Sequence, residues 1–117
     1  MKFIINIYCS PSSLPAAKSA FRFAETLLDE GHEIYRIFFF NEGVLHCINS
    51  TKLSSLTQQW QTLIQQHNLD AVICSASAEK RGISLNGENI PLDGFIVSGL
   101  GQLIDGINQS DRLITFG

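Results

Sequence analysis

Apolar residues along this chain follow two alternating spacings, and each spacing predicts a different kind of element. Residues 3–8 and 34–40 are apolar at almost every position, which is typical of strands buried on both faces of a sheet. Shorter apolar runs at residues 71–74, 95–97 and 113–116 have the composition of strands. The pattern therefore predicts about five strands, with the central ones fully buried.

Between these runs, apolar residues spaced three and four apart predict helices with one buried face. Such a face covers residues 17–28, ahead of Gly31, a residue typical of the position just after a helix. Two further faces cover residues 53–64 and 100–107, and we expect Ser98 to cap the second of these. Helices thus alternate with the predicted strands along the chain.

The alternation of strands and helices determines the fold class. Each right-handed crossover brings the chain back in the same direction, so the sheet should be mainly parallel, with helices on both faces. Residues 75–82 should contain a short helical turn, whereas residues 41–50 and 86–94 should be loops. No repeat or linker divides the chain. We expect one three-layer α/β/α domain over residues 1–117, with a mainly parallel sheet of about five strands.

Composition and charge exclude several classes of function. The chain has 117 residues and 44% apolar content, which suffices for one core. Its net charge is −3, and Lys80 and Arg81 are the only adjacent basic pair, so direct nucleic-acid binding is not expected. No apolar run approaches the roughly 18–20 residues that cross a membrane, so we expect a soluble, cytoplasmic protein. The chain has three cysteines, so at least one thiol should be free.

One of these cysteines, Cys74, lies at the edge of the predicted sheet where functional sites usually occur. It ends the strand at residues 71–74, and sites in such sheets gather at the carboxyl ends of the strands. A helix start after it, together with Lys80 and Arg81, would favour the nucleophilic thiolate. Cys74 is therefore a candidate nucleophile or sulfur carrier, with a buried structural thiol as the alternative. Cys9 also ends a strand, and position alone does not choose between the two.

Two other segments suggest different chemistry. The serine-rich loop at residues 10–13 could hold a phosphate, as in flavodoxin-like domains, although serines and proline are also common in ordinary turns. Gly99 opens a possible dinucleotide motif, but Ile104 stands where its third glycine belongs. His46 beside Cys47 could act as a base or a metal ligand, yet the sequence has no second Cys/His cluster. We therefore expect no metal.

The segment around Cys74 resembles a known family. Residues 72–83, Val-Ile-Cys-Ser-Ala-Ser-Ala-Glu-Lys-Arg-Gly-Ile, are similar to the active-cysteine segment of the DsrE/TusD sulfurtransferases. Similar stretches occur in order along nearly the whole chain, at residues 20–24, 31–33, 38–44, 95–103 and 111–112. The resemblance implies a DsrE-like fold. It also implies that Cys74, rather than Cys9 or Cys47, is the reactive cysteine.

The resemblance implies a sulfur-relay function. Cys74 would accept persulfide sulfur from a donor carrier protein and pass it to an acceptor protein, as in tRNA 2-thiouridine formation or sulfur oxidation. Lys80 and Arg81 are the candidates for stabilising the anionic sulfur, and no cofactor is implied. The implied partners are sulfur-carrier proteins and homologous subunits, in a hetero-hexamer or a homo-oligomer. Two alternatives stay open, a flavodoxin-like flavin- or nucleotide-binding domain and a non-catalytic assembly subunit of a relay complex.

Overall fold

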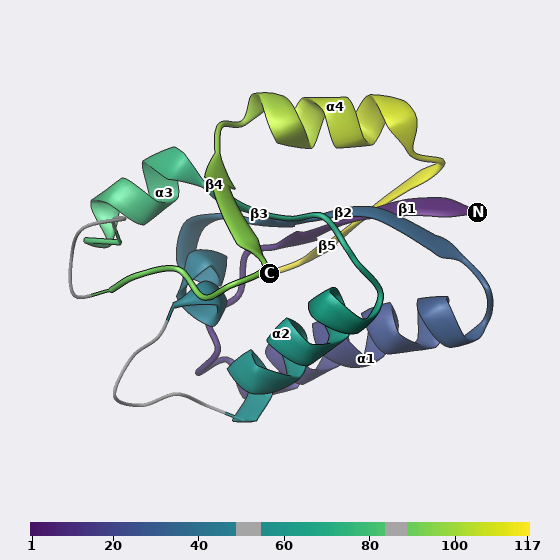
Figure 1. Cartoon of the computed structure of the whole chain (residues 1–117), viewed down its shortest axis with the longest axis horizontal. Helices are drawn as coiled ribbons and strands as arrows, with labels where there is room; N and C mark the ends of the chain where they lie inside the picture. The colour runs from purple at the N-terminus through teal and green to yellow at the C-terminus, as the bar shows by residue number, and fades with distance from the viewer. Residues whose placement is uncertain (49–54, 84–88) are drawn as a thin grey trace.

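A parallel sheet of five strands forms the centre of the molecule, in the order β4-β3-β2-β1-β5 (Figure 1). The computed structural model describes residues 1–48, 55–83 and 89–117. Every strand pair is parallel, so the carboxyl ends of all five strands lie at the same edge. The strands are β1 (Lys2–Ile7), β2 (Glu33–Phe39), β3 (Ala71–Cys74), β4 (Phe95–Ser98) and β5 (Arg112–Phe116).

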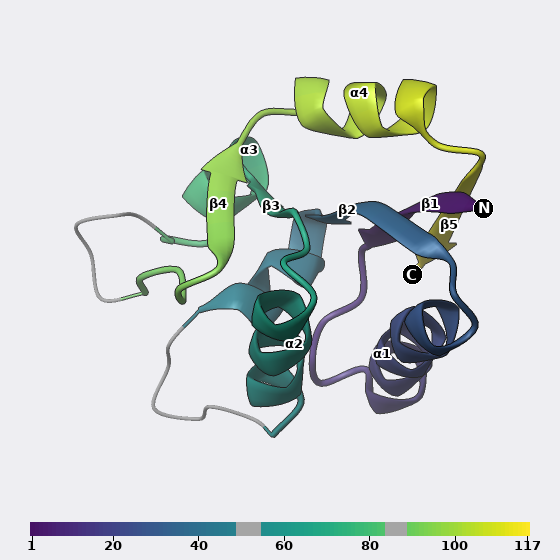
Figure 2. The same cartoon turned by 45° about the vertical axis from the view of Figure 1, so that its right-hand side comes forward.

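Helices cover both faces of this sheet, which confirms the predicted three-layer α/β/α class. Helices α1 (Leu14–Asp29) and α2 (Ser55–Gln66) lie on one face, and α4 (Gly101–Gln109) lies on the other (Figures 1 and 2). Helix α3 (Ser75–Lys80) continues directly from β3, and a 3-10 helix, η1 (Asn41–Cys47), follows β2. Among the described helices, none is long and apolar enough to cross a membrane.

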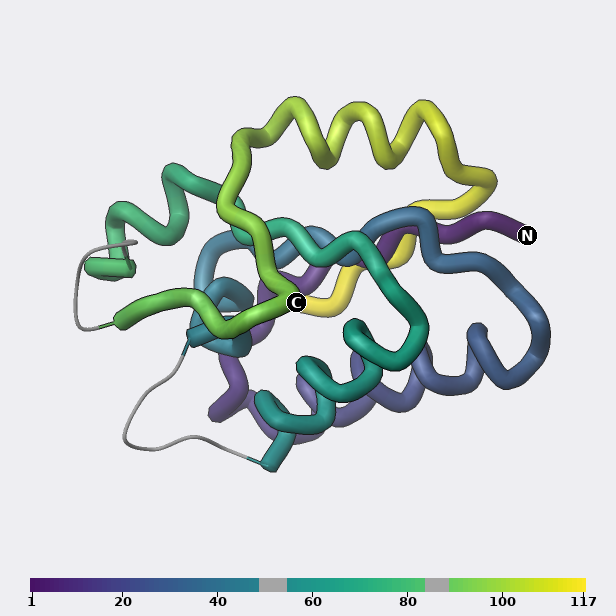
Figure 3. The backbone as a smooth tube through the Cα atoms, in the orientation of Figure 1, coloured from purple at the N-terminus to yellow at the C-terminus, as the bar shows by residue number. Residues whose placement is uncertain are grey.

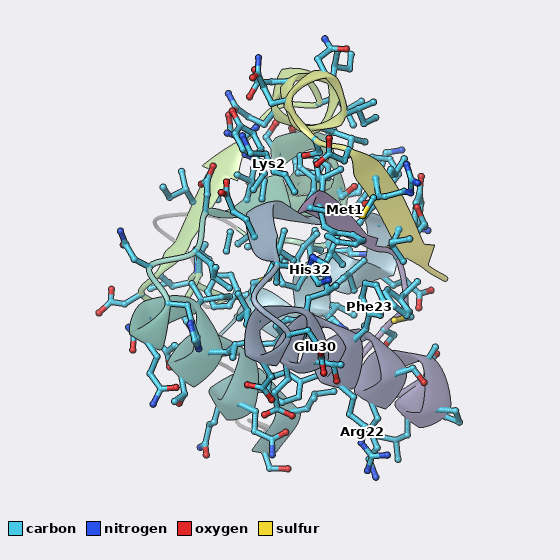
Figure 4. All side chains as sticks on the ribbon, turned by 90° about the vertical axis from the view of Figure 1, so that its right-hand side faces the viewer. Met1, Lys2, Arg22, Phe23, Glu30 and His32 are labelled. Atoms are coloured by element: carbon cyan, nitrogen blue, oxygen red, sulfur yellow. The ribbon has the colours of Figure 1, made fainter. Side chains whose placement is uncertain are left out.

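The last part of the chain provides α4, the helix that covers the second face of the sheet. It leaves β4 at one edge of the sheet, runs along α4 and ends in β5 at the opposite edge (Figure 3). Because β4 and β5 are the two edge strands, the crossover places α4 over the central strands β1 and β2. Figure 4 shows this arrangement end-on, with α4 above the sheet and the other two long helices below it.

The main core lies between the sheet and α1 and α2. Three alanines on α1, at positions 17, 20 and 24, are fully buried and let that helix approach the strands closely. Trp60 on α2 is also fully buried, with its ring edge-on to Phe21 and to Phe39. A Cβ on Gly43 would lie 1.9 Å from the Ile7 carbonyl oxygen, so only glycine lets η1 pack against the end of β1.

The amino ends of the strands are closed by contacts around the first residues. The amino group of Met1 lies 3.0 Å from Nδ1 of His32, and the Phe3 ring meets the rings of His32 and Phe23 edge-on. Figure 4 shows the labelled side chains of His32 and Phe23 between the sheet and α1. Gly31, which adopts a positive φ of 83°, makes the turn from α1 into β2, as its sequence position predicts.

Three details differ from the sequence-based expectations or fall outside what the structure describes. Residues 41–47, predicted as loop, form η1, which packs against the carboxyl edge of the sheet. Ser98 does not cap α4; it is the last residue of β4, and Leu100 precedes the helix. Parts of the predicted loops and of the second helical face, at residues 49–54 and 84–88, lie outside the described residues.

Candidate functional site

Cys74 lies where β3 turns into α3, at the carboxyl edge of the sheet. Its backbone is extended (φ −63°, ψ 119°), and it serves as the residue before the first helical position, Ser75. On one side it pairs with Ser98 of the edge strand β4. The sequence predicted this placement because a short apolar strand ended at the cysteine and small residues followed.

The side chain of Cys74 lies on the face that α4 covers, and it is almost completely buried. Only 1% of the residue is exposed. It shares a small apolar cluster with Phe38 and Val72, and the half-buried side chains of Phe40 and Leu103 pack against that cluster. Apolar side chains therefore cover the sulfur, and a partner sulfur can reach it only after one of these side chains moves.

Helix α3 begins directly after Cys74, whose side chain makes no capping hydrogen bond to the helix in this structure. The first backbone N–H groups of a helix have no carbonyl partner within the helix, and in α3 they follow directly after Cys74. Such groups carry partial positive charge and can donate hydrogen bonds to an anion. A thiolate or a persulfide anion on Cys74 is the species that this arrangement can stabilise.

Lys80 and Arg81 lie at the other end of α3 from Cys74. Lys80 is the last of the six residues of α3 and Arg81 follows it, so Lys80 lies about 9 Å along the helix axis from the cysteine at the usual rise per residue. The Arg81 guanidinium donates hydrogen bonds to the Asn41 side-chain oxygen and to the Ser77 carbonyl oxygen, the latter at 3.4 Å, while Lys80 is exposed. The structure thus joins Arg81 to η1 and does not bring either cation to the sulfur. Their role in stabilising anionic sulfur stays a prediction.

The other two cysteines lie in a different environment from Cys74. Cys9 and Cys47 belong to the main core on the α1 and α2 face. Burial raises the pKa of the Cys9 thiol, and complete burial raises the pKa of Cys47 well above its usual value. All three cysteines are free thiols. Burial in the main core therefore makes Cys9 and Cys47 poor nucleophiles at neutral pH.

His46 is a structural histidine rather than a base for Cys47. Its ring is fully buried, and Nε2 donates a hydrogen bond to the Cys9 carbonyl oxygen at 2.9 Å. Burial lowers its pKa to about 4, so the ring is neutral at pH 7. Within the described part of the chain, no group of three His, Cys, Asp or Glu side chains could hold a metal ion.

The serine-rich loop between β1 and α1 uses its hydroxyl groups locally. The Ser10 hydroxyl lies 2.8 Å from the Ser12 hydroxyl and accepts a hydrogen bond from the Ser12 backbone N–H at 3.2 Å. The Ser13 N–H also donates to the Ser10 carbonyl oxygen at 3.0 Å. These contacts are those of an ordinary serine turn. The phosphate-binding alternative for residues 10–13 stays untested.

The sequence patterns did not reveal the residues that cover Cys74 or the charged residues that anchor α4 to the sheet. Phe40 and Leu103 follow no motif, since their contact with the cysteine depends on how α4 crosses the sheet. Arg36 did carry a signal: it is the one charged residue inside the apolar run at residues 34–40. Its exposed fraction is 8%, and its guanidinium contacts two carboxylates.

Comparison with known proteins gives the same family along the whole chain. A profile of the DsrE/DsrF-like family matches residues 1–116. A DsrE protein of Allochromatium vinosum is 40% identical, over 100% of this chain and 99% of its own length. The sulfurtransferase TusD homolog of Pseudomonas aeruginosa is 40% identical over 100% of this chain and 98% of its own length. The sulfurtransferase TusD of Klebsiella pneumoniae is 34% identical, covering 99% of this chain and 100% of that protein.

A solved structure shows the same architecture. The ychN protein of E. coli superposes with a TM-score of 0.80, over 99% of this chain and 100% of that one, at 21% sequence identity. This likeness concerns the fold alone. The family profile and the full-length relatives confirm the resemblance seen around Cys74, and the chain belongs to the DsrE/DsrF-like family.

Proposed function

We propose that this protein is a sulfurtransferase that carries sulfur as a persulfide on Cys74 between a donor protein and an acceptor protein. The observation that carries the proposal is the placement of Cys74 as the last residue of β3, directly before α3, within a family whose full-length relatives are named sulfurtransferases. Cys74 is the best candidate because it ends β3 within the segment at residues 72–83 that resembles the family's active-cysteine segment, whereas Cys9 and Cys47 lie outside that segment.

The reaction consists of two thiol exchanges. In the first, the Cys74 thiolate attacks the outer sulfur of a donor persulfide; a new sulfur–sulfur bond forms, the donor's own bond breaks, and the donor leaves as a thiolate. In the second, an acceptor thiolate attacks the outer sulfur of the Cys74 persulfide, and Cys74 leaves as a thiolate. Neither step needs an oxidant or a reductant, because each bond that breaks is replaced by an equivalent bond.

The site's surroundings support both steps. The N–H groups at the start of α3 can stabilise the thiolate that attacks in the first step and leaves in the second. The apolar cluster of Phe38 and Val72 keeps water away from the persulfide, which limits its loss by side reactions. Lys80 and Arg81 would stabilise the anionic sulfur on Cys74, and this remains part of the proposal.

Partners of two kinds follow from the proposal. Sulfur-carrier proteins would supply and remove the sulfur, and either tRNA 2-thiouridine formation or sulfur oxidation could consume it. Homologous subunits would cover the apolar side chains that this chain exposes on α4 and at both sheet edges: Ile96, Leu100, Ile104, Ile107 and Leu113. The three free thiols suit a reducing compartment such as the cytoplasm.

A transfer assay tests the function. Protein loaded with labelled sulfur from a small persulfide is separated from the donor and mixed with an excess of an acceptor thiol. The wild-type protein should take up label and then release it to the acceptor, whereas Cys74→Ser should do neither. Cys47→Ser is the matched control and should behave as wild type. A Cys74→Ser protein that still loads and releases sulfur would contradict the role of Cys74, whereas a wild-type protein that takes up no label would favour the non-catalytic assembly subunit.

A further inference from the structure

A buried arginine joins the sheet to α4. Arg36, on β2, is 8% exposed; its Nε donates to an Asp70 carboxylate oxygen at 2.7 Å. Its NH1 group donates to two acceptors on α4, the Gln102 carbonyl oxygen at 2.7 Å and an Asp105 carboxylate oxygen at 3.0 Å. The guanidinium also lies 5.1 Å from the centre of the Tyr35 ring, whose hydroxyl donates to Asp105 at 2.9 Å. We call these five residues the Arg36 clamp.

The electrostatics of the clamp match this geometry. The hydrogen bond from Arg36, followed by that from Tyr35, lowers the pKa of the Asp105 carboxyl, so it is ionised at neutral pH. The hydrogen bond to Asp105 likewise raises the pKa of the Tyr35 hydroxyl, which therefore stays protonated as a donor. Charge-assisted hydrogen bonds of this kind are stronger than neutral ones.

The clamp holds the turn of α4 that covers the reactive cysteine. Leu103 comes directly after Gln102 and lies two positions before Asp105, and its side chain packs against the Cys74 cluster. Because the clamp fixes α4 both just before and just after Leu103, it determines where that side chain lies over the sulfur. Arg36 and Cys74 themselves share no contact among those that the structure shows.

Apart from the Arg36 clamp, α4 makes only a small apolar contact with the sheet. Gly106 is the only buried residue of the helix, and a Cβ there would lie 2.0 Å from the end of the Ile4 side chain. Ile104 and Ile107 are 60% and 43% exposed. A helix with so small an apolar contact has low local stability, so loss of a buried ionic anchor should shift its opening equilibrium noticeably.

We propose that Arg36 is a positioning residue for sulfur transfer: by holding α4 on the sheet it keeps Leu103 over the Cys74 sulfur and so limits how readily another sulfur reaches it. This inference rests on the proposed function for the role of Cys74. Its physical part, the access of reagents to the thiol, can be measured without any sulfur relay.

The test is the rate at which iodoacetamide alkylates each cysteine of the folded protein at neutral pH, followed by peptide mass. Asp105→Asn and Arg36→Gln should raise the rate at Cys74 by about tenfold, as expected when a local opening equilibrium loses an ionic anchor. Leu103→Ala should also raise the alkylation rate at Cys74. When Leu103→Ala is combined with Asp105→Asn or Arg36→Gln, the two increases should not multiply, because each substitution acts on the same movement of α4. Arg36→Lys, which keeps the cation, should restore part of the protection.

Two controls separate a local effect from general loss of stability. Arg22→Gln changes an exposed arginine on α1, on the side of the molecule away from α4 (Figure 4), and should leave the rate at Cys74 unchanged. Cys9 and Cys47 lie in the main core, so local movement of α4 should leave their alkylation unchanged. An unchanged rate at Cys74 in Asp105→Asn and Arg36→Gln would overturn the inference. A parallel rise at all three cysteines would do so too.

A second readout connects access to transfer. Sulfur loading from glutathione persulfide should accelerate in Asp105→Asn by the same factor as alkylation of Cys74. If alkylation accelerates and loading does not, Arg36 governs access to the thiol but has no positioning role in transfer, and the inference fails. If Cys74 does not load sulfur in the wild-type protein either, it is the proposed function that fails, so the two failures remain distinguishable.

Discussion

At the scale of single residues, the same side chain has different chemistry in different parts of this fold. Cys9 and Cys47 lie in the main core, and burial raises the pKa of both thiols. Cys74 lies on the other face of the sheet, in a small apolar cluster, as the residue directly before α3. The position at the end of β3 and the family resemblance, rather than exposure, therefore make Cys74 the candidate carrier.

His46 should make the stability of the fold depend on pH. Burial lowers its pKa from 6.5 to about 4, so between these values the unfolded chain binds a proton that the folded protein does not. The free energy of unfolding should therefore fall as the pH drops from about 6.5 to about 4, by a total of about 3 kcal/mol. Urea unfolding at a series of pH values measures this loss.

Two variants assign that pH dependence to His46. His46→Gln should lower stability at pH 7 and flatten the pH dependence, because the buried imidazole is gone. His67→Gln changes an exposed histidine after α2 and should leave the dependence as in wild type. The assignment is wrong if His46→Gln retains the same slope of stability against pH as the wild-type protein.

Features that depend on neighbouring residues in the chain could be predicted from the sequence, whereas contacts between residues far apart in the chain could not. The position of Cys74 at the end of β3 was predictable because a short apolar run ends there, while its role as the sulfur carrier stays a prediction. The partners of Arg36 were not predictable, because Asp70 and Asp105 are 34 and 69 positions away in sequence. The burial of Cys74 by Leu103 was missed for the same reason, since it depends on how α4 crosses the sheet.

At the scale of elements, the strands and long helices follow directly from the spacing of apolar residues. Doubly buried strands show continuous apolar runs, and one-sided helices show a repeat of three and four, so both were predicted to within a few residues. The 3-10 helix η1 was missed because it has no such repeat. Its position depends on packing instead, and above all on Gly43 against the end of β1.

Gly43 should tolerate no side chain. A Cβ there would lie 1.9 Å from the Ile7 carbonyl oxygen, a backbone atom that cannot move aside without distorting β1. We expect Gly43→Ala to lower the free energy of unfolding by about 2 kcal/mol or more. Gly99→Ala is the matched control, since nothing lies within 4 Å of the added methyl group, and its effect should be much smaller. Equal stabilities of the two variants in urea unfolding would contradict this packing.

At the scale of the whole molecule, the two faces of the sheet are covered unequally. Two long helices bury one face, whereas α4 is the one long helix over the other face among the described residues (Figure 2). Ile96 and Ile104 on this side are each 60% exposed, and Leu113 on β5 is 43% exposed. Single exposed apolar residues are ordinary, but several on one side favour contact with another subunit.

A charge on this face should weaken assembly. Ile104→Asp places a carboxylate on the outer side of α4 without touching the Arg36 clamp, so the fold should remain while subunit association is lost. Gln59→Asp, on the exposed side of α2, is the matched control and should leave association intact. Sedimentation of whichever assembly the wild-type chain forms, alone or with a homologous subunit, measures the change. Full assembly of Ile104→Asp would show that this face is not the interface.

The central claim, that Cys74 carries sulfur, is tested most directly by the intact mass of the reduced protein after incubation with a persulfide donor. The account predicts that wild type, Cys9→Ser and Cys47→Ser each gain the mass of one sulfur atom, that a reductant removes it, and that Cys74→Ser gains none. A gain that persists in Cys74→Ser, or one that disappears with Cys9→Ser, would contradict the account.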